Sequence, residues 1–87
     1  MPTPAIIERM RELHTELGET QPTPATAEEL ARIKQQVDMV MLQPDHAPHY
    51  KGLSDRLLFA YVGFQIDHPK LAGLMQGVAT SLSNAGI

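Results

Sequence analysis

The sequence contains no cysteine and no tryptophan, and its only aromatic residues are two tyrosines and two phenylalanines. Without cysteine, a chain can form neither a disulfide framework nor a thiolate metal site. A domain of this length buries only about 60% of its unfolded surface and is marginally stable by itself. We therefore expect the chain to depend on efficient helix packing or on oligomerisation.

Positive charge and long apolar segments are also scarce. The formal net charge is −3, which argues against binding to the phosphate backbone of nucleic acids. The longest nearly continuous apolar run, residues 57–64, is shorter than half of the roughly 20 residues with which a helix crosses a bilayer. No basic and apolar signal pattern opens the chain. We expect a soluble cytoplasmic protein that binds neither nucleic acid nor membrane.

The first part of the chain predicts an amphipathic helix over residues 4–17. Thr3 followed by Pro4 is a typical helix start, and Gly18 is well placed to end the helix in a left-handed cap. Charged side chains occupy the remaining faces. One apolar stripe recurs at helical spacing and consists of Ile6, Met10, Leu13 and Leu17.

A second amphipathic helix is predicted over residues 24–42. Its start has two interpretations: Thr23 caps a helix that begins at Pro24, or Thr26 and Glu29 form a capping box. Its apolar stripe comprises Ala27, Leu30, Ile33, Val37, Val40 and Met41. The short connection between the two helices predicts an antiparallel hairpin.

Residues 43–52 predict an exposed loop, and residues 53–65 predict a third helix. The apolar run inside the latter segment could also be a buried strand, but the chain offers no partner strand for its backbone hydrogen bonds. As a helix it would be apolar on nearly every face. We therefore expect it to be buried on more than one side.

A fourth helix is predicted over residues 69–84. His68 precedes Pro69 and must leave the helical conformation, so the third helix stops there and the fourth begins. Gly86 suits a left-handed stop, with Ile87 packing back on the helix. The predicted stripe consists of Leu71, Leu74, Met75, Val78 and Leu82.

These elements predict an all-α fold of two antiparallel hairpins. The chain forms a single helical domain over 1–87, with an N-terminal hairpin at 4–42, a loop at 43–52 and a C-terminal hairpin at 53–87. The C-terminal hairpin carries more apolar surface than one small hairpin can cover. We therefore expect a homo-oligomer, with a dimer favoured, or a complex with another helical protein.

The expected function is a non-enzymatic protein–protein interaction or oligomerisation module. Its sequence shows no nucleophile elbow and no glycine-rich phosphate loop, so no catalytic residue and no cofactor is predicted. The predicted interaction surface is apolar and comprises Leu57, Leu58, Tyr61, Val62, Phe64, Leu71, Leu74, Met75, Val78 and Leu82. The alternative is a divalent-metal site that uses the histidines of the loop and of the corner, His46, His49 and His68.

Short motifs along the chain support one resemblance. They are Leu13-His14, Glu16-Leu17, Phe64, His68-Pro69, Leu71-Ala72, Leu82 and Gly86-Ile87. With these residues the sequence resembles a family of short bacterial helical proteins catalogued as a domain of unknown function. That resemblance implies a small helical protein, and the family label indicates no particular activity. The chain departs from the pattern at Gln65, where an acidic residue is usual.

Overall fold

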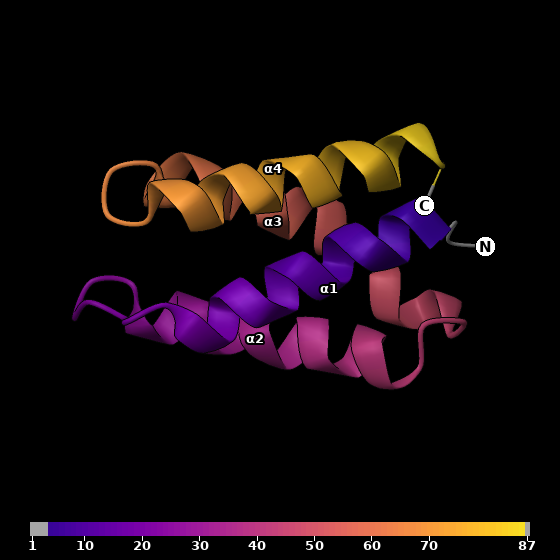
Figure 1. Cartoon of the computed structure of the whole chain (residues 1–87), viewed down its shortest axis with the longest axis horizontal. Helices are drawn as coiled ribbons and strands as arrows, with labels where there is room; N and C mark the ends of the chain where they lie inside the picture. Colours follow the sequence, from indigo (N-terminus) through magenta and orange to yellow (C-terminus); the bar gives the residue numbers. More distant parts are fainter. Residues whose placement is uncertain (1–3, 87) are drawn as a thin grey trace.

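The computed structural model describes residues 4–86 and is helical, as predicted (Figure 1). In chain order its elements are α1 (Pro4–Glu19), α2 (Ala27–Leu42), the short 3-10 helix η1 (Ala47–Tyr50), α3 (Leu53–Phe64) and α4 (Pro69–Asn84). No strand occurs within residues 4–86. The all-α prediction is confirmed, and the segment that could have been a strand is helical.

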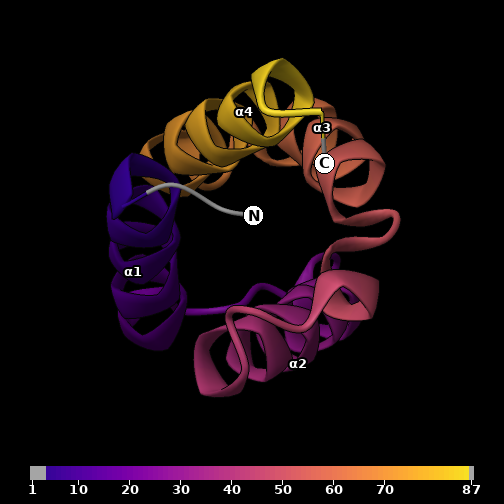
Figure 2. The same cartoon turned by 90° about the vertical axis from the view of Figure 1, so that its right-hand side faces the viewer.

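The helices form a closed ring. α1 pairs with α2, α3 pairs with α4, and α4 also packs against α1, so the end-on view in Figure 2 shows the order α2, α1, α4, α3. The contact that closes the ring, between α3 and α2, is much smaller than the pairing of α3 with α4. The molecule measures 35 × 22 × 19 Å. The two hairpins therefore cover each other mainly through α1 and α4.

One hydrophobic core fills the ring and draws on all four α-helices. The predicted stripes of the first, second and fourth helices supply most of it. Two predicted members, Met41 and Leu74, are only partly buried, and Ala27 is exposed. The buried apolar residues of these three helices are Ile6, Met10, Leu13, Leu17, Leu30, Ile33, Val37, Val40, Leu71, Ala72, Met75, Val78, Ala79 and Leu82.

Helix ends differ from the prediction at α1. The helix continues through Gly18, whose φ is not positive, and the predicted left-handed cap there is wrong. The helix ends at Glu19, and the next residue, Thr20, donates both its backbone N–H and its hydroxyl to the Glu16 carbonyl, at 2.9 and 2.7 Å. At the other end of the chain Gly86 has φ +75, as predicted. The predicted cap at Thr3 and the predicted contact of Ile87 lie outside the described residues.

α2 begins at the later of the two predicted positions, directly after Thr26, but without the capping box. The Thr26 hydroxyl accepts a hydrogen bond from the Thr23 backbone N–H at 3.0 Å and lies 3.2 Å from Nε2 of His68. Glu29 faces Arg56 of α3 at 3.7 Å instead of turning back to the helix end. The buried Thr26 side chain thus joins the α1–α2 turn to the corner before α4.

Residues 43–52 are mostly exposed, as predicted, but they include the short helix η1 and one buried side chain. Tyr50 is only 3% exposed, and its hydroxyl donates to the Pro44 carbonyl at 2.7 Å. Gly52 then adopts φ +75, a conformation that costs an L-residue about 1–2 kcal/mol. The buried tyrosine anchors the crossing between hairpins, and the glycine turns the chain into α3.

Two glycine substitutions test these assignments. Gly18→Ala should raise the free energy of unfolding by about 0.5–1 kcal/mol, because alanine is the better helix former. A methyl group there is exposed and meets no atom within 4 Å. Gly52→Ala should lower the free energy of unfolding by about 1–2 kcal/mol, because alanine would have to adopt the left-handed conformation that Gly52 has. Urea denaturation followed by circular dichroism measures both. A loss of stability in Gly18→Ala would show that α1 ends at that glycine in solution.

Candidate functional site

The most distinctive surface of the molecule is the outer side of α3. Phe59 is 80% exposed, Val62 70% and Ile66 92%, and Leu58 is 40% exposed beside them. We call these four residues the α3 outer face. Ile66 lies two residues beyond Phe64, the last residue of α3, in the turn that leads to α4, and is four residues after Val62. Large apolar side chains exposed together in this way are uncommon on a small monomeric protein.

The register of α3 explains why these side chains point outward. A helix turns about 100° per residue, so residues spaced by three and four share a side. The core side consists of Leu53, Leu57, Ala60 and Phe64. Phe59, Val62 and Ile66 have the same spacing on the opposite side. The prediction that α3 is buried on more than one side is therefore wrong for the single chain.

The ten residues of the predicted interaction surface divide into three groups. Tyr61 and Leu74 are half-buried and pack against the core. Leu58 and Val62 are exposed and belong to the α3 outer face. The other six are covered by the chain's own helices: Leu57, Phe64, Leu71, Met75, Val78 and Leu82.

Sequence reasoning missed Phe59 and Ile66, although a signal was present. Asp55 lies four residues before Phe59, and so on the same side of the helix. A carboxylate in that line marks the side that faces water. The core side carries no charged residue at any of its four positions.

Charged residues lie at both ends of the α3 outer face. Asp55 and Arg56 lie at the start of α3, Asp67 lies in the corner before α4, and Lys70 is the second residue of α4. Within the described residues, neither Asp55 nor Asp67 forms an ion pair or a hydrogen bond, whereas the cations face Glu29 at 3.7 Å and Glu16 at 3.3 Å. The border of the face therefore carries charges of both signs.

The structure does not bring the three histidines of the predicted metal site together. The rings of His46 and His49 lie 4.3 Å apart, edge to face, at the end of the molecule that holds residues 43–52. His68 lies at the corner between α3 and α4, which Figure 1 shows at the opposite end, and its ring packs against Phe64. Across residues 4–86, no group of three or more histidine, aspartate or glutamate side chains could hold a metal ion.

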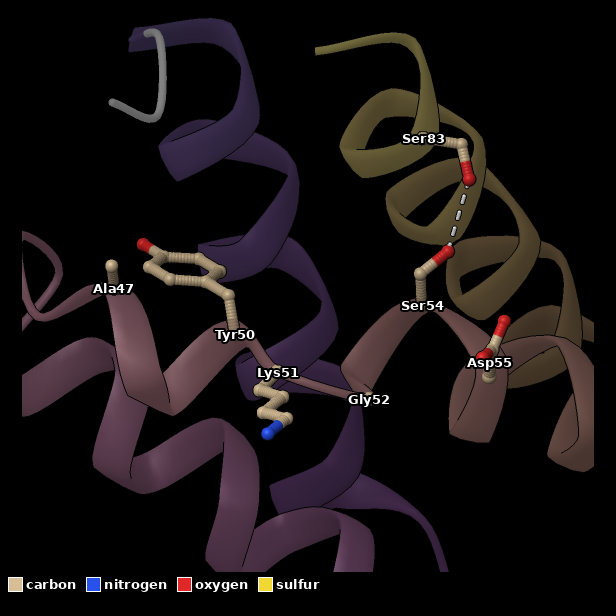
Figure 3. A pocket seen from close by; sticks show the side chains of 7 residues that line it. All are labelled: Ala47, Tyr50, Lys51, Gly52, Ser54, Asp55 and Ser83. Atoms are coloured by element: carbon tan, nitrogen blue, oxygen red, sulfur yellow. Dashed lines mark hydrogen bonds between the residues drawn. The ribbon is translucent and has the colours of Figure 1, made fainter. Parts of the chain in front are cut away.

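An open depression of about 450 Å³ lies where residues 47–55 meet the end of α4 (Figure 3). Ser54 points toward Ser83, with their hydroxyl oxygens 3.1 Å apart, and its hydroxyl also contacts the Ala79 carbonyl. Lys51 and Asp55 point in different directions. Because the polar groups do not converge, the depression lacks the arrangement expected of a small-molecule site.

Tyr50 borders this depression and has a raised pKa. Burial of the phenol is the main cause, and the nearby carboxylate of Asp45 adds to it, since both disfavour the phenolate. The side chain therefore remains a neutral hydrogen-bond donor throughout the physiological pH range. Its role is structural, because its hydroxyl is engaged with the Pro44 carbonyl.

Comparison with known proteins gives one match. The sequence model of the family described as "Domain of unknown function (DUF4404)" matches residues 6–87, which confirms the resemblance to a family of unknown function. No match was found among curated proteins or among solved structures. Among the described residues, no helix is long and apolar enough to cross a membrane.

Tyr50 generates a prediction about pH. A raised folded-state pKa contributes stability that is fully present below pH 10.0, the usual pKa, and is lost as the pH rises through the folded value. Tyr50→Phe should be about 1 kcal/mol less stable than the natural chain at neutral pH, through loss of one hydrogen bond. That difference should shrink above pH 10.0. Urea denaturation at a series of pH values measures it, with Tyr61→Phe as the matched control. A constant difference across the series would contradict the assignment.

Proposed function

We propose that this chain, which belongs to the DUF4404 family, is a non-enzymatic protein–protein interaction module whose docking surface is the α3 outer face. The observation that carries this proposal is the line formed by Phe59, Val62 and Ile66, each at least 70% exposed. Their spacing of three and four residues matches the way a helix presents a stripe to another helix. The natural partner surface is therefore an apolar helix.

The charge around the face favours a protein over other partners. An amphipathic helix that lies on anionic lipid carries a border rich in lysine and arginine. Here Asp55 and Asp67 outnumber the one adjacent cation of α3, Arg56, and the whole chain has a net charge of −3. The same charges supply no attraction for a phosphate backbone. We accordingly propose a cytoplasmic location, with neither nucleic acid nor membrane as partner.

The polar groups of the chain support binding rather than catalysis. Ser54 bonds with Ser83 and a backbone carbonyl, and within the described residues no histidine hydrogen-bonds to its hydroxyl to act as a base. His14 pairs with Asp38 at 2.7 Å and joins α1 to α2. These groups stabilise the bundle, whereas most of the α3 outer face is left uncovered by the single chain.

Photo-cross-linking in living cells tests the proposal. A photoreactive phenylalanine analogue in place of Phe59 should give a discrete covalent adduct, because the exposed ring would lie inside the docked interface. The adduct should disappear when Ile66→Glu is introduced into the same chain, since a charge buried against an apolar partner is strongly unfavourable. Gel electrophoresis and mass spectrometry identify the adduct.

The control places the same analogue at Gln35, an exposed position on α2. We expect no discrete adduct from that site. Equal adducts from both positions, or none from Phe59, would rule out the α3 outer face as the docking surface.

A further inference from the structure

We propose that the partner of the α3 outer face is a second copy of this chain, and that two copies form a weak twofold dimer through their α3 helices. This inference rests on the proposed function, because it names the occupant of the same surface. Three features of the structure support it: the area of the face, the arrangement of its charges, and the free approach to its backbone.

The area suits a weak dimer. From the exposed fractions of its four side chains, the face offers on the order of 500 Å² of apolar surface, at the upper end of what monomers expose. One twofold contact would cover this surface on both copies, and so would bury about 1,000 Å² in total, the lower limit for a specific interface. The contact is too small for an obligate dimer. It is sufficient for one that forms and separates with concentration.

The charges make the face complementary to itself. In a twofold dimer the α3 helices run either antiparallel or parallel. One end of the face carries Asp55 and Arg56, and the other end carries Asp67. In the antiparallel case Asp67 comes near Arg56 of the second copy, and in the parallel case Asp55 does. Both aspartates are unpaired within the described chain, and Arg56 faces Glu29 only at 3.7 Å, so either arrangement brings an unpaired carboxylate to a loosely held guanidinium.

The backbone of α3 is open to close approach. Gly63 lies one helical turn after Phe59, is exposed, and has nothing from the other elements of the described chain within 4 Å of the position of a Cβ. A neighbouring helix could therefore lie near the main chain here without steric conflict. Val62 stands at the middle of the apolar line, where a twofold axis would place it close to its own copy.

Sedimentation velocity of the purified chain from low micromolar to millimolar concentration tests the dimer. The average mass should rise from the 9.6 kDa of one chain toward twice that value. Ile66→Glu should raise the dimer dissociation constant by at least about tenfold, because it buries an unpaired charge. Leu42→Glu is the matched control, because Leu42 is another strongly exposed apolar residue (81%) but lies on α2. This substitution should leave the dissociation constant unchanged.

A second variant keeps the test independent of any effect of the glutamate on folding. The chain has no cysteine, so a single Val62→Cys should form a disulfide-linked dimer under mild oxidation, whereas Gln35→Cys should not. A chain that remains monomeric up to millimolar concentration would overturn the dimer. So would a dimer lost in Leu42→Glu and retained in Ile66→Glu.

The two proposals can fail separately. A monomeric purified chain that still gives a Phe59 adduct with a different protein in cells would refute the second copy and retain the interaction module. A monomeric chain without any adduct would refute both.

Discussion

The short connection between α3 and α4 is the constraint on which the rest of the structure depends. Only four residues separate the two helices, so they must lie antiparallel and side by side. His68 marks the corner, packs on Phe64 and contacts the buried Thr26 hydroxyl of the other hairpin. The corner thus sets the orientation of α3 relative to α4 and ties it to the α1–α2 turn. Once this orientation is set, one side of α3 faces the core and the opposite side has no helix to cover it.

Four helices in a ring give each helix two neighbours, and this geometry explains the contrast between α3 and α4. α4 lies between α3 and α1, and its apolar stripe is buried almost completely. α3 lies between α4 and α2, but its contact with α2 is small. α3 therefore has more apolar side chains than its two neighbouring helices can cover. The excess is concentrated on one line, rather than scattered, because the helical repeat separates the two sides of α3.

Much of the fold could be predicted from sequence because its signals are local. Helical spacing, the X-Pro step before Pro69 and the left-handed Gly86 all act within a few residues. The predicted helix end at Gly18 was wrong because the helix continues to Glu19. There the N–H and hydroxyl of Thr20 donate to the Glu16 carbonyl of the last turn. The face of α3 that meets the core could not be read from apolar spacing, since both sides share it. Deciding between them requires the positions of α2 and α4, although Asp55 pointed to the answer.

The sparse contact between α2 and α3 has a consequence for how the molecule opens. The ion pair that spans it, Arg56 with Glu29, is long and partly exposed, and such pairs contribute about 0–1 kcal/mol. Separation at this seam leaves the α1–α2, α1–α4 and α3–α4 contacts intact, so it is a local event that costs less than global unfolding. The bundle therefore has one preferred line of entry for solvent, and the amide hydrogens along that line exchange before those of the α1–α4 contact.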